Sequence, residues 1–355
     1  MHRIKFRLWC RDARTRLRAL ALLCLFAPLA AVAQSRSAAE VTRVTVGALR
    51  FTSSGPLFLA RERGYFAAER LEVEIRFFEA APTIAVAVAT GDLTFGSAAL
   101  TAAFYNLAAD GKLVIVAGQA REERGYPGNL ILVTRRAYDA GVTELRDLFA
   151  QPFGLTQHGS PSHYQLGQLA RAHAVPMGAT TVRAFQTLPN LVVAMRADRV
   201  TWAIIAPPIA QDLVTTGAAV SLGRFSDNAG FQFGAIFAQR SLVEERTDMV
   251  RRFLRGYRRG IADYAALYRA SAGQSAEQAE RAREAAILVA RHVYPDDAPE
   301  DGARKVLASA FFVDPAGGVD EDDVARQVDW YVEQGLVRRL FDVSSIMRLD
   351  LLRAE

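Results

Sequence analysis

The chain has 355 residues, of which 51% are hydrophobic and 23% are charged, with 43 basic residues, 38 acidic residues and a formal net charge of +5. This length is long for a single core and favours two lobes or domains, and the hydrophobic content is sufficient for sizeable cores. The basic excess would allow nucleic-acid binding, and the two cysteines would allow thiol chemistry. However, most of the basic excess and both cysteines lie in an N-terminal segment that we expect to be removed, so neither function class is expected of the mature protein.

That N-terminal segment has the pattern of a secretory signal peptide. Seven Lys or Arg residues precede residue 19 against one acid, Asp12, and an apolar run covers residues 19–32. An A-x-A cleavage site ends at Ala33. The alternative is an uncleaved membrane anchor, but the run is shorter than the roughly 20 residues that a bilayer span needs. We therefore predict a cleaved leader over residues 1–33 and a soluble periplasmic protein.

Removal of this leader changes the chemistry that is available to the chain. It takes away seven of the 43 basic residues and one of the 38 acidic ones, which leaves a net charge near −1. A nucleic-acid partner is therefore not expected. Both cysteines, Cys10 and Cys24, are lost as well. Disulfides, a thiolate nucleophile and Cys-ligated metals are thus excluded from the mature protein.

The first predicted unit of the mature chain is strand, loop, helix, strand. Val44, Val46 and Ala48 alternate with polar or small residues, as in a strand, and Phe51–Pro56 is a loop rich in Ser and Gly. A helix follows up to Gly64, and alternation resumes over Leu71–Phe77. In open α/β sheets, ligands bind at the carboxyl ends of strands, so we expect one at this loop.

The same criteria predict further elements in chain order. The first half continues with a helix at Pro82–Thr90, a strand at Leu93–Gly96, a helix at Ser97–Asp110, a strand at Lys112–Ala117, a loop at Arg121–Gly128 and a strand at Asn129–Thr134. The second half has helices at Thr143–Phe149, Ser162–His173 and Leu188–Arg196 and from Pro207 to before Gly217, and strands at Phe153–Thr156, Val182–Phe185, Trp202–Ile205, Ala219–Leu222 and Phe231–Ala238. This alternation predicts two α/β halves with mostly parallel sheets.

Beyond Arg240 the sequence becomes helical throughout. Amphipathic helices are expected at Ser241–Arg269, Ser275–His292, Glu300–Phe312, Asp320–Gln334 and Val343–Leu352. We expect them to pack on the first lobe. Five arginines crowd the first of these helices, either as a solvated face or as a basic patch.

No catalytic motif stands out in the mature sequence. It contains no G-x-S-x-G elbow, no phosphate-binding P-loop and no H-E-x-x-H motif. His158 and His163 are five residues apart across a loop, which is a weak spacing for a metal pair. We therefore predict neither a metal nor a cofactor, and no enzymatic activity.

Two loops of matching chemistry supply the candidate site. Each is rich in Ser and Gly, follows a strand and precedes a helix; they comprise Thr52, Ser53, Ser54 and Gly55, and His158, Gly159, Ser160, Pro161 and Ser162. Helix N-termini with hydroxyls beside them can bind an anionic or strongly accepting group, although ordinary helix capping explains either loop alone. Their equivalent places favour two sides of one cleft. Ser97 and Ala98 would add a third wall, and the amide of Gln119 could donate or accept.

These motifs also resemble a known family. The segments are Gly55–Phe66 with Leu71–Glu74, Ala89–Leu93, the G-[ST]-x-x-H loop at Gly159–His163, Ile204–Pro208 and Asp323–Leu336. Together they resemble the periplasmic substrate-binding proteins of ABC importers for nitrate, sulfonates, taurine and thiamin-pyrimidine precursors. The resemblance covers roughly residues 41–264. The chain departs from the pattern at Thr94 and Thr201, where Asp is frequent, and at Ala206, where an aromatic is frequent; the last change would enlarge the pocket.

The resemblance implies a type II periplasmic-binding-protein fold, with two α/β lobes, a ligand cleft, two crossover strands and C-terminal helices. Lobe I would comprise residues 41–132 and 233–355, and lobe II residues 133–232, with crossings near 129–134 and 231–238. The implied pocket loops add three residues to the candidate site, namely Phe51, His163 and Pro207.

The implied function is capture of a small anionic or aromatic organic solute and its delivery to an ABC permease in the inner membrane by a monomeric protein. Arg50, Arg121 and Arg124 are candidates for holding an anion. The alternatives are an enzyme on the same scaffold, such as a pyrimidine-precursor or decarboxylase-like protein, and a ligand-sensing module of a signalling partner.

Overall fold

The computed structural model describes residues 41–268 and 275–352. The predicted signal peptide, residues 1–33, lies outside these ranges. Within them, every helix is too short or too polar to cross a bilayer.

The first sheet holds the predicted strand–loop–helix–strand unit. Its five strands stand in the order β2-β1-β3-β12-β4. Their bounds are β1 Thr42–Ala48, β2 Leu71–Phe77, β3 Phe95–Ala99, β4 Leu113–Gly118 and β12 Gly234–Gln239. Strand β1 is parallel to β2 and β3, whereas β12 enters between β3 and β4 and is antiparallel to both.

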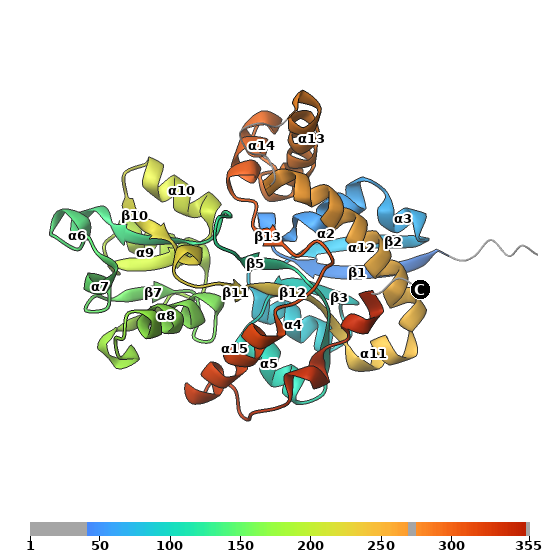
Figure 1. The fold of residues 1–355 in the computed structure, drawn as a ribbon, viewed down its shortest axis with the longest axis horizontal. Helices are drawn as coiled ribbons and strands as arrows, with labels where there is room; N and C mark the ends of the chain where they lie inside the picture. The colour runs from blue at the N-terminus through green and yellow to red at the C-terminus, as the bar shows by residue number, and fades with distance from the viewer. Residues whose placement is uncertain (1–40, 269–274, 353–355) are drawn as a thin grey trace, which may run out of the picture. The chain divides into compact units, whose positions relative to one another are not determined.

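Helices cover both faces of this sheet and complete lobe I (blue to teal and orange in Figure 1). They are α2 Gly55–Glu62, α3 Tyr65–Ala68, α4 Ala81–Ala89, α5 Ala102–Ala109, α11 Arg240–Glu245, α12 Thr247–Tyr268, α13 Ala276–Val293 and α14 Pro299–Ala308. Helices α2 and α12 form one core with β1. Their close approach depends on Gly260, because a Cβ there would lie 2.1 Å from the carbonyl oxygen of Pro56. Helices α4 and α5 cover the other face.

The second sheet, with its helices, makes up lobe II (green to yellow in Figure 1). Its strands stand in the order β10-β6-β9-β7-β8. Their bounds are β6 Leu130–Thr134, β7 Phe153–Leu155, β8 Val182–Ala184, β9 Trp202–Ile205 and β10 Ala219–Arg224. The helices are α6 Arg135–Asp139, α7 Leu145–Leu148, α8 Pro161–Ala172, α9 Leu188–Arg196 and α10 Pro207–Thr215, with short 3₁₀ turns η2 Met177–Ala179 and η3 Phe225–Asp227. Helices α9 and α10 form a core on one face, and α8 packs on the other.

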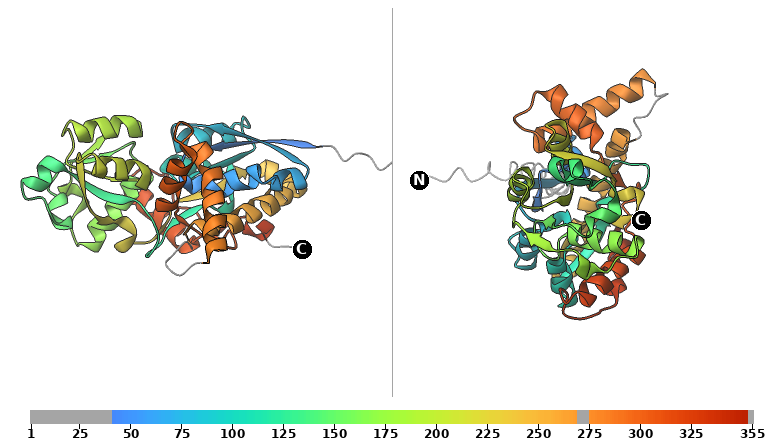
Figure 2. Two further views of the ribbon diagram at one scale, coloured as in Figure 1. Left: turned by 90° about the horizontal axis from the view of Figure 1, so that it is seen from above. Right: turned by 90° about the vertical axis from the view of Figure 1, so that its left-hand side faces the viewer.

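A small third sheet connects the two lobes. Strand β5 Ala120–Glu122 lies between β11 Phe231–Gln232 and β13 Phe312–Val313 and is antiparallel to both. The chain therefore passes between the lobes at β5 and again at β11, and the left view of Figure 2 shows the two lobes side by side. The predicted crossing at 129–134 is wrong, because β6 pairs with β9 and β10 inside the second sheet. The predicted boundary after residue 132 accordingly falls within a strand of lobe II.

Helix α15 Glu321–Glu333 contacts both lobes. Its Gln327 accepts a hydrogen bond of 3.0 Å from the hydroxyl of Tyr105 in α5, and Asp323 accepts one of 3.1 Å from Tyr164 in α8. The backbone N–H of Gln232, in the connecting strand β11, donates to Asp323 at 2.7 Å. From the sequence we expect the C-terminal helices to pack on the first lobe, but α15 packs on the second lobe as well.

Several predicted boundaries differ from the structure. Ser97 and Ala98 lie in strand β3 instead of starting a helix, because β12 pairs with β3 as far as Ala99. The predicted helix from residue 241 is broken at Arg246 into α11 and α12. The last predicted helix is two 3₁₀ turns, η4 Val343–Ile346 and η5 Leu349–Leu352.

The arginines of α12 bond mainly to lobe I. Arg255 donates to the carboxylate of Glu69 through two nitrogens at 3.0 and 2.8 Å, and Arg259 lies over the ring of Tyr65 at 4.0 Å. Arg258 donates to the carbonyl of Leu352 at 3.0 Å. These contacts fasten α12 to its neighbours, which favours a structural role for these three arginines.

Candidate functional site

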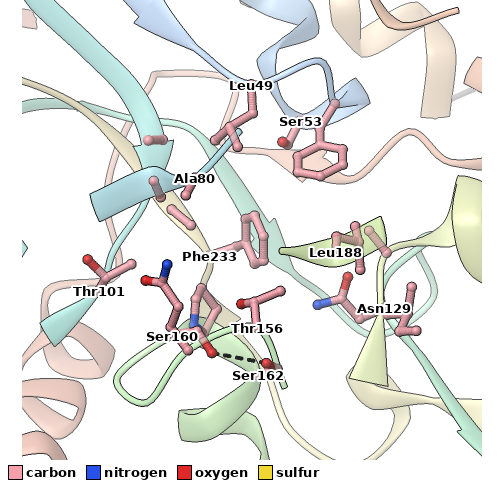
Figure 3. A pocket seen from close by; sticks show the side chains of 18 of the residues that line it. Leu49, Ser53, Ala80, Thr101, Asn129, Thr156, Ser160, Ser162, Leu188 and Phe233 are labelled. Atoms are coloured by element: carbon pink, nitrogen blue, oxygen red, sulfur yellow. Dashed lines mark hydrogen bonds between the residues drawn. The ribbon is translucent and has the colours of Figure 1, made fainter. Parts of the chain in front are cut away.

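A cavity lies where the carboxyl ends of strands from both lobes meet (Figure 3). Its empty space is about 930 Å³, part of which is open to solvent. Lobe I and the connecting segment contribute Leu49, Phe51, Ser53, Glu79, Ala80, Ala81, Pro82, Ala98, Ala99, Thr101, Gln119 and Phe233. Lobe II contributes Asn129, Thr156, Gln157, Ser160, Pro161, Ser162, Gln165, Gln186, Leu188, Leu191, Ile204, Ile205 and Ala206. Small-molecule sites have this mixture of apolar walls and few polar groups.

The lobe I wall is built from strand ends and helix starts. Phe51 is in extended conformation and leads into the 3₁₀ turn η1 Thr52–Ser54, which continues into α2. Pro82 lies in the first turn of α4, where its missing N–H costs nothing. Thr101 caps α5 by accepting from the backbone N–H of Phe104 at 3.2 Å. Each helix thus begins at the cavity because it follows a strand of the parallel part of the sheet.

The lobe II wall is built in the same way. Ser160 is the N-cap of α8, and its hydroxyl lies 3.1 Å from that of Ser162. Gly159 just before it has φ +78°, a conformation that glycine adopts readily. Its backbone N–H donates to Nδ1 of His163 at 3.2 Å. This local bond fixes the loop, so the serine hydroxyls face the cavity (Figure 3).

Six of the thirteen predicted site residues line this cavity. They are Phe51, Ser53, Ala98, Gln119, Ser160 and Ser162. The cavity therefore brings together both predicted loops, one from each lobe. Contact of these residues with a solute stays a prediction.

The other residues of the first loop support the wall from behind. The hydroxyl of Thr52 lies 2.9 Å from that of Ser309. Ser54 and Ser97 accept hydrogen bonds from Nε2 of Gln119 at 3.3 and 2.8 Å. Gly55 gives room to Tyr264, since a Cβ there would lie 2.4 Å from its ring. Ser54 and Ser97 thus orient the amide of Gln119.

In the second lobe, three predicted residues likewise lie outside the lining. Gly159 accepts a backbone hydrogen bond from Ala102 of lobe I at 3.0 Å. His163 is 7% exposed and packs edge-on against Trp330, with ring centroids 5.0 Å apart. Pro207 starts α10, whose N-cap Ala206 lines the cavity in its place.

The three candidate arginines are engaged elsewhere. Arg50 donates to the carbonyl of His292 at 2.8 Å and lies over the ring of Phe77. Arg121 pairs with Glu123 at 2.7 Å, and Arg124 donates to the carbonyl of Asp227 at 2.7 Å. Among the described residues that line the cavity, the only charged side chain is Glu79.

Sequence reasoning missed much of the lining. Two segments lie at the carboxyl ends of β2 and β8, namely Ala80–Pro82, which leads into α4, and Gln186–Leu188, which leads into α9. The rule that singled out the serine loops applies to both, but neither carries a hydroxyl cluster. Asn129 and Gln165 carried no local signal, since their place in the wall depends on how β6 and α8 come together.

Burial shifts two titratable groups near the cavity. Burial, together with the neighbouring His158, lowers the pKa of His163 to about 4, so this ring is neutral at neutral pH and can accept from Gly159. Burial raises the pKa of Glu122, in β5, to about 8. His158 and His163 stand edge to face with ring centroids 5.2 Å apart.

Comparison with known proteins identifies the family. The sequence model described as NMT1/THI5 like matches residues 52–267, which is more than half of the chain. The chain belongs to the NMT1/THI5-like family. This match and the solved structures described next confirm the predicted resemblance to the nitrate/sulfonate/taurine/thiamin-pyrimidine type of periplasmic binding protein at the level of the family. No curated protein matches the sequence of this NMT1/THI5-like chain.

Solved structures confirm the predicted fold. The alkanesulfonate-binding protein SsuA from Xanthomonas axonopodis pv. citri, bound to MOPS, is 18% identical, with a TM-score of 0.66 over 87% of this chain and 99% of that one. The periplasmic nitrate-binding protein NrtA from Synechocystis PCC 6803 is 14% identical, with a TM-score of 0.67 over 88% and 87%. The desulfurization enzyme DSZB is 12% identical, with a TM-score of 0.57 over 88% and 97%. This NMT1/THI5-like chain thus has the fold of periplasmic binding proteins, which an enzyme also uses.

Proposed function

We propose that the protein is a periplasmic solute-binding protein that holds a small organic solute between its lobes and delivers it to an ABC importer. The observation that carries this proposal is the shared cavity, in which Ser53 from lobe I and Ser160 from lobe II belong to one lining. The predicted leader and the two binding proteins of the same fold support an exported role. A monomer that docks on a permease in the inner membrane is the expected form.

The connections between the lobes suit a closing motion. Within residues 41–268 and 275–352, the short strands β5 and β11 carry the chain across, and hinge bending needs φ/ψ changes at few residues. A solute shifts an open–closed equilibrium only through contacts that the closed state provides, so it must touch both lobes. Helix starts on both lobes, at α4 and at α8, can donate backbone hydrogen bonds to its acceptor atoms.

Substitution of Ser160 tests this proposal. Ser160→Trp fills the cavity, so solute binding should be lost while the melting temperature stays near that of the wild type. The matched control is Gly178→Trp, which adds the same bulk on the exposed surface of lobe II, where a Cβ meets no atom within 4 Å. Binding is measured by calorimetry and thermal shift with a panel of sulfonates, aromatic carboxylates and pyrimidines, and by native mass spectrometry of co-purified solute. Equal binding by Ser160→Trp and the wild type would refute the proposal.

An enzyme is the second candidate, because the desulfurization enzyme DSZB shares the fold. The two functions differ in what is released. A binding protein returns the solute unchanged, so mass spectra of the solute before and after prolonged incubation separate them. A time-dependent product that Ser160→Trp abolishes would favour the enzyme.

A further inference from the structure

Three buried polar residues lie in the lobe II wall of the cavity or directly behind it. Glu122 ends the connecting strand β5, Asn129 precedes β6, and Gln165 lies in α8. Their exposed fractions are 0%, 4% and 0%. Asn129 and Gln165 line the cavity, and Glu122 lies behind them. Buried polar groups of this kind are normally fully hydrogen-bonded.

The direction of the hydrogen bonds among these residues follows from Oε1 of Glu122, which acts as an acceptor in both the ionised and the neutral carboxyl when the proton is on Oε2. Oε1 of Glu122 accepts from Nε2 of Gln165 at 3.3 Å and from the backbone N–H of Asn129 at 2.9 Å. Because Nε2 of Gln165 faces Glu122, its Oε1 faces Asn129, where it accepts from Nδ2 at 3.1 Å. The orientation of the Asn129 amide is thereby set. Its Oδ1 is buried without a partner among the residues that the structure describes.

We propose that the bound solute donates a hydrogen bond, from an N–H or O–H group, to Oδ1 of Asn129, and that Glu122 is the positioning residue that fixes this acceptor. This inference rests on the proposed function and names the class of solute. The relay Glu122–Gln165–Asn129 turns a side chain that could donate or accept into an obligate acceptor.

The charges around the cavity specify the donor further. Glu79 is the single charged side chain among the described lining residues, so a carboxylate or sulfonate placed at Asn129 would meet an acceptor and no side-chain cation. A neutral carboxamide or sulfonamide meets both sides of the site, because it donates to Asn129 and offers an oxygen to the helix start at Ser160. Leu188, Leu191 and Ile204 provide an apolar wall for its body. The inferred class is therefore a neutral amide-like solute with an apolar or aromatic body.

The surroundings of Glu122 favour its neutral form. Gly128 packs on its carboxyl, since a Cβ there would lie 2.0 Å from Oε2. Burial raises the pKa of Glu122 to about 8, and the nearby Asp227 adds to the rise. The two neighbouring arginines bond to other groups: Arg121 pairs with Glu123, and Arg124 donates to the backbone carbonyl of Asp227. The relay thus adds no charge beside the cavity at neutral pH. The neutral side chain of the Glu122→Gln variant has the same shape and keeps the relay uncharged.

The test compares matched probes on the full mature protein. Benzamide is paired with benzoate, and benzenesulfonamide with benzenesulfonate, by calorimetry at neutral pH. We expect each neutral probe to bind the wild type at least about tenfold more tightly than its anionic partner, because only the neutral member carries the N–H donor. Glu122→Gln should keep this preference within about threefold, since it retains the Oε1 acceptor. The preference should also become independent of pH, because glutamine does not ionise. Glu122→Leu and Asn129→Leu should lose it.

A measurement on the wild type keeps the inference testable if the leucine variants fail to fold. The side-chain amide protons of Asn129 and Gln165 should exchange slowly with solvent in NMR spectra without solute, and the Asn129 signals should shift on addition of benzamide. Solvent-like exchange would overturn the relay. Failure of both neutral probes to bind, binding of the anions with equal or greater affinity, or equal effects of Glu122→Gln and Glu122→Leu would overturn the inference. If the anionic probes bind and Ser160→Trp abolishes their binding, the inference of a neutral solute is overturned, but the proposed solute-binding function stands.

Discussion

The hydroxyl of Tyr331 donates a hydrogen bond of 3.1 Å to the backbone carbonyl of Ser160, which joins helix α15 to the N-cap residue of α8 at the cavity. Four residues earlier in the same helix, Gln327 accepts from Tyr105 of lobe I and donates to the carbonyl of Gln232 in β11 at 2.9 Å. Helix α15 is therefore bonded to both lobes and to the connecting strand. These bonds hold the two lobes together on the side of the molecule where α15 lies.

Removal of this hydroxyl should weaken both folding and binding. Tyr331 is fully buried, so Tyr331→Phe leaves the Ser160 carbonyl without this donor. We expect a loss of about 1 to 2 kcal/mol in the free energy of unfolding, measured by denaturant titration, and a several-fold weaker affinity for the solute. Tyr138→Phe is the control, because its ring is partly exposed in lobe II and lies over Arg135. Equal losses in both variants would show that the Tyr331–Ser160 bond is without special effect.

The sequence was sufficient for elements whose ends are marked locally. Helix α9, at Leu188–Arg196, and strand β9, at Trp202–Ile205, match their predicted bounds, because a Thr cap with Pro in the first turn marks the start of the helix, and a compact apolar run forms the strand. The residues Ser97–Ala99 carry no such marks. They become strand because Ala235 and its neighbours, far along the chain, pair with them.

The site divides in the same way. Ser53 and Ser160 could be found because hydroxyl-rich loops after strands are visible in the sequence. The relay Glu122–Gln165–Asn129 could not, since its three members come from a connecting strand, a helix and a loop and acquire their roles only when these segments meet. The crossing at β5 also depends on long-range pairing, because β5 becomes a strand by pairing with β11 and β13. Its local sequence alone predicts a charged loop.

The contact between Gly159 and lobe I should matter for stability. A Cβ on Gly159 would lie 2.6 Å from Cβ of Ala102, whose backbone N–H donates to the Gly159 carbonyl at 3.0 Å. The control is Gly141→Ala, since Gly141 also has positive φ, at +102°, but open space around its Cβ. Each variant should lose about 1 kcal/mol to backbone strain, and Gly159→Ala at least about 1 kcal/mol more. Denaturant unfolding measures the difference, and identical losses would contradict the importance of this contact.

His163 should make the protein sensitive to acid. Burial lowers the pKa of His163 from 6.5 to about 4, and the unfolded chain keeps the ordinary value. The folded state thus binds this proton less tightly, so its contribution to stability is complete above about pH 6.5 and is lost as the pH falls towards about 4. Protonation also removes the Nδ1 acceptor of the Gly159 N–H.

The expected loss from this group is about 2 kcal/mol between about pH 7.5 and about pH 4.5. His163→Gln can still accept from Gly159 but does not titrate, so its unfolding free energy should fall less steeply over this range. The ring protons of His163, followed by NMR, should titrate well below the ordinary histidine pKa of 6.5. A titration of His163 near pH 6.5 would contradict the prediction.

Glu122 should act in the opposite direction at alkaline pH. Burial raises its pKa from 4.5 to about 8, so the folded protein holds a proton that the unfolded chain releases. This contribution to stability is complete below about pH 4.5 and is lost as the pH rises to about 8, with a slope of at most about 1.4 kcal/mol per pH unit. Glu122→Gln keeps the neutral shape and cannot ionise. We therefore expect the variant to be more stable than the wild type at about pH 8, and the advantage to shrink as the pH is lowered to about 5. Unfolding curves across this range give the difference directly, and parallel pH profiles for the two proteins would mean that Glu122 is ionised in the folded state and that its surroundings stabilise the charge.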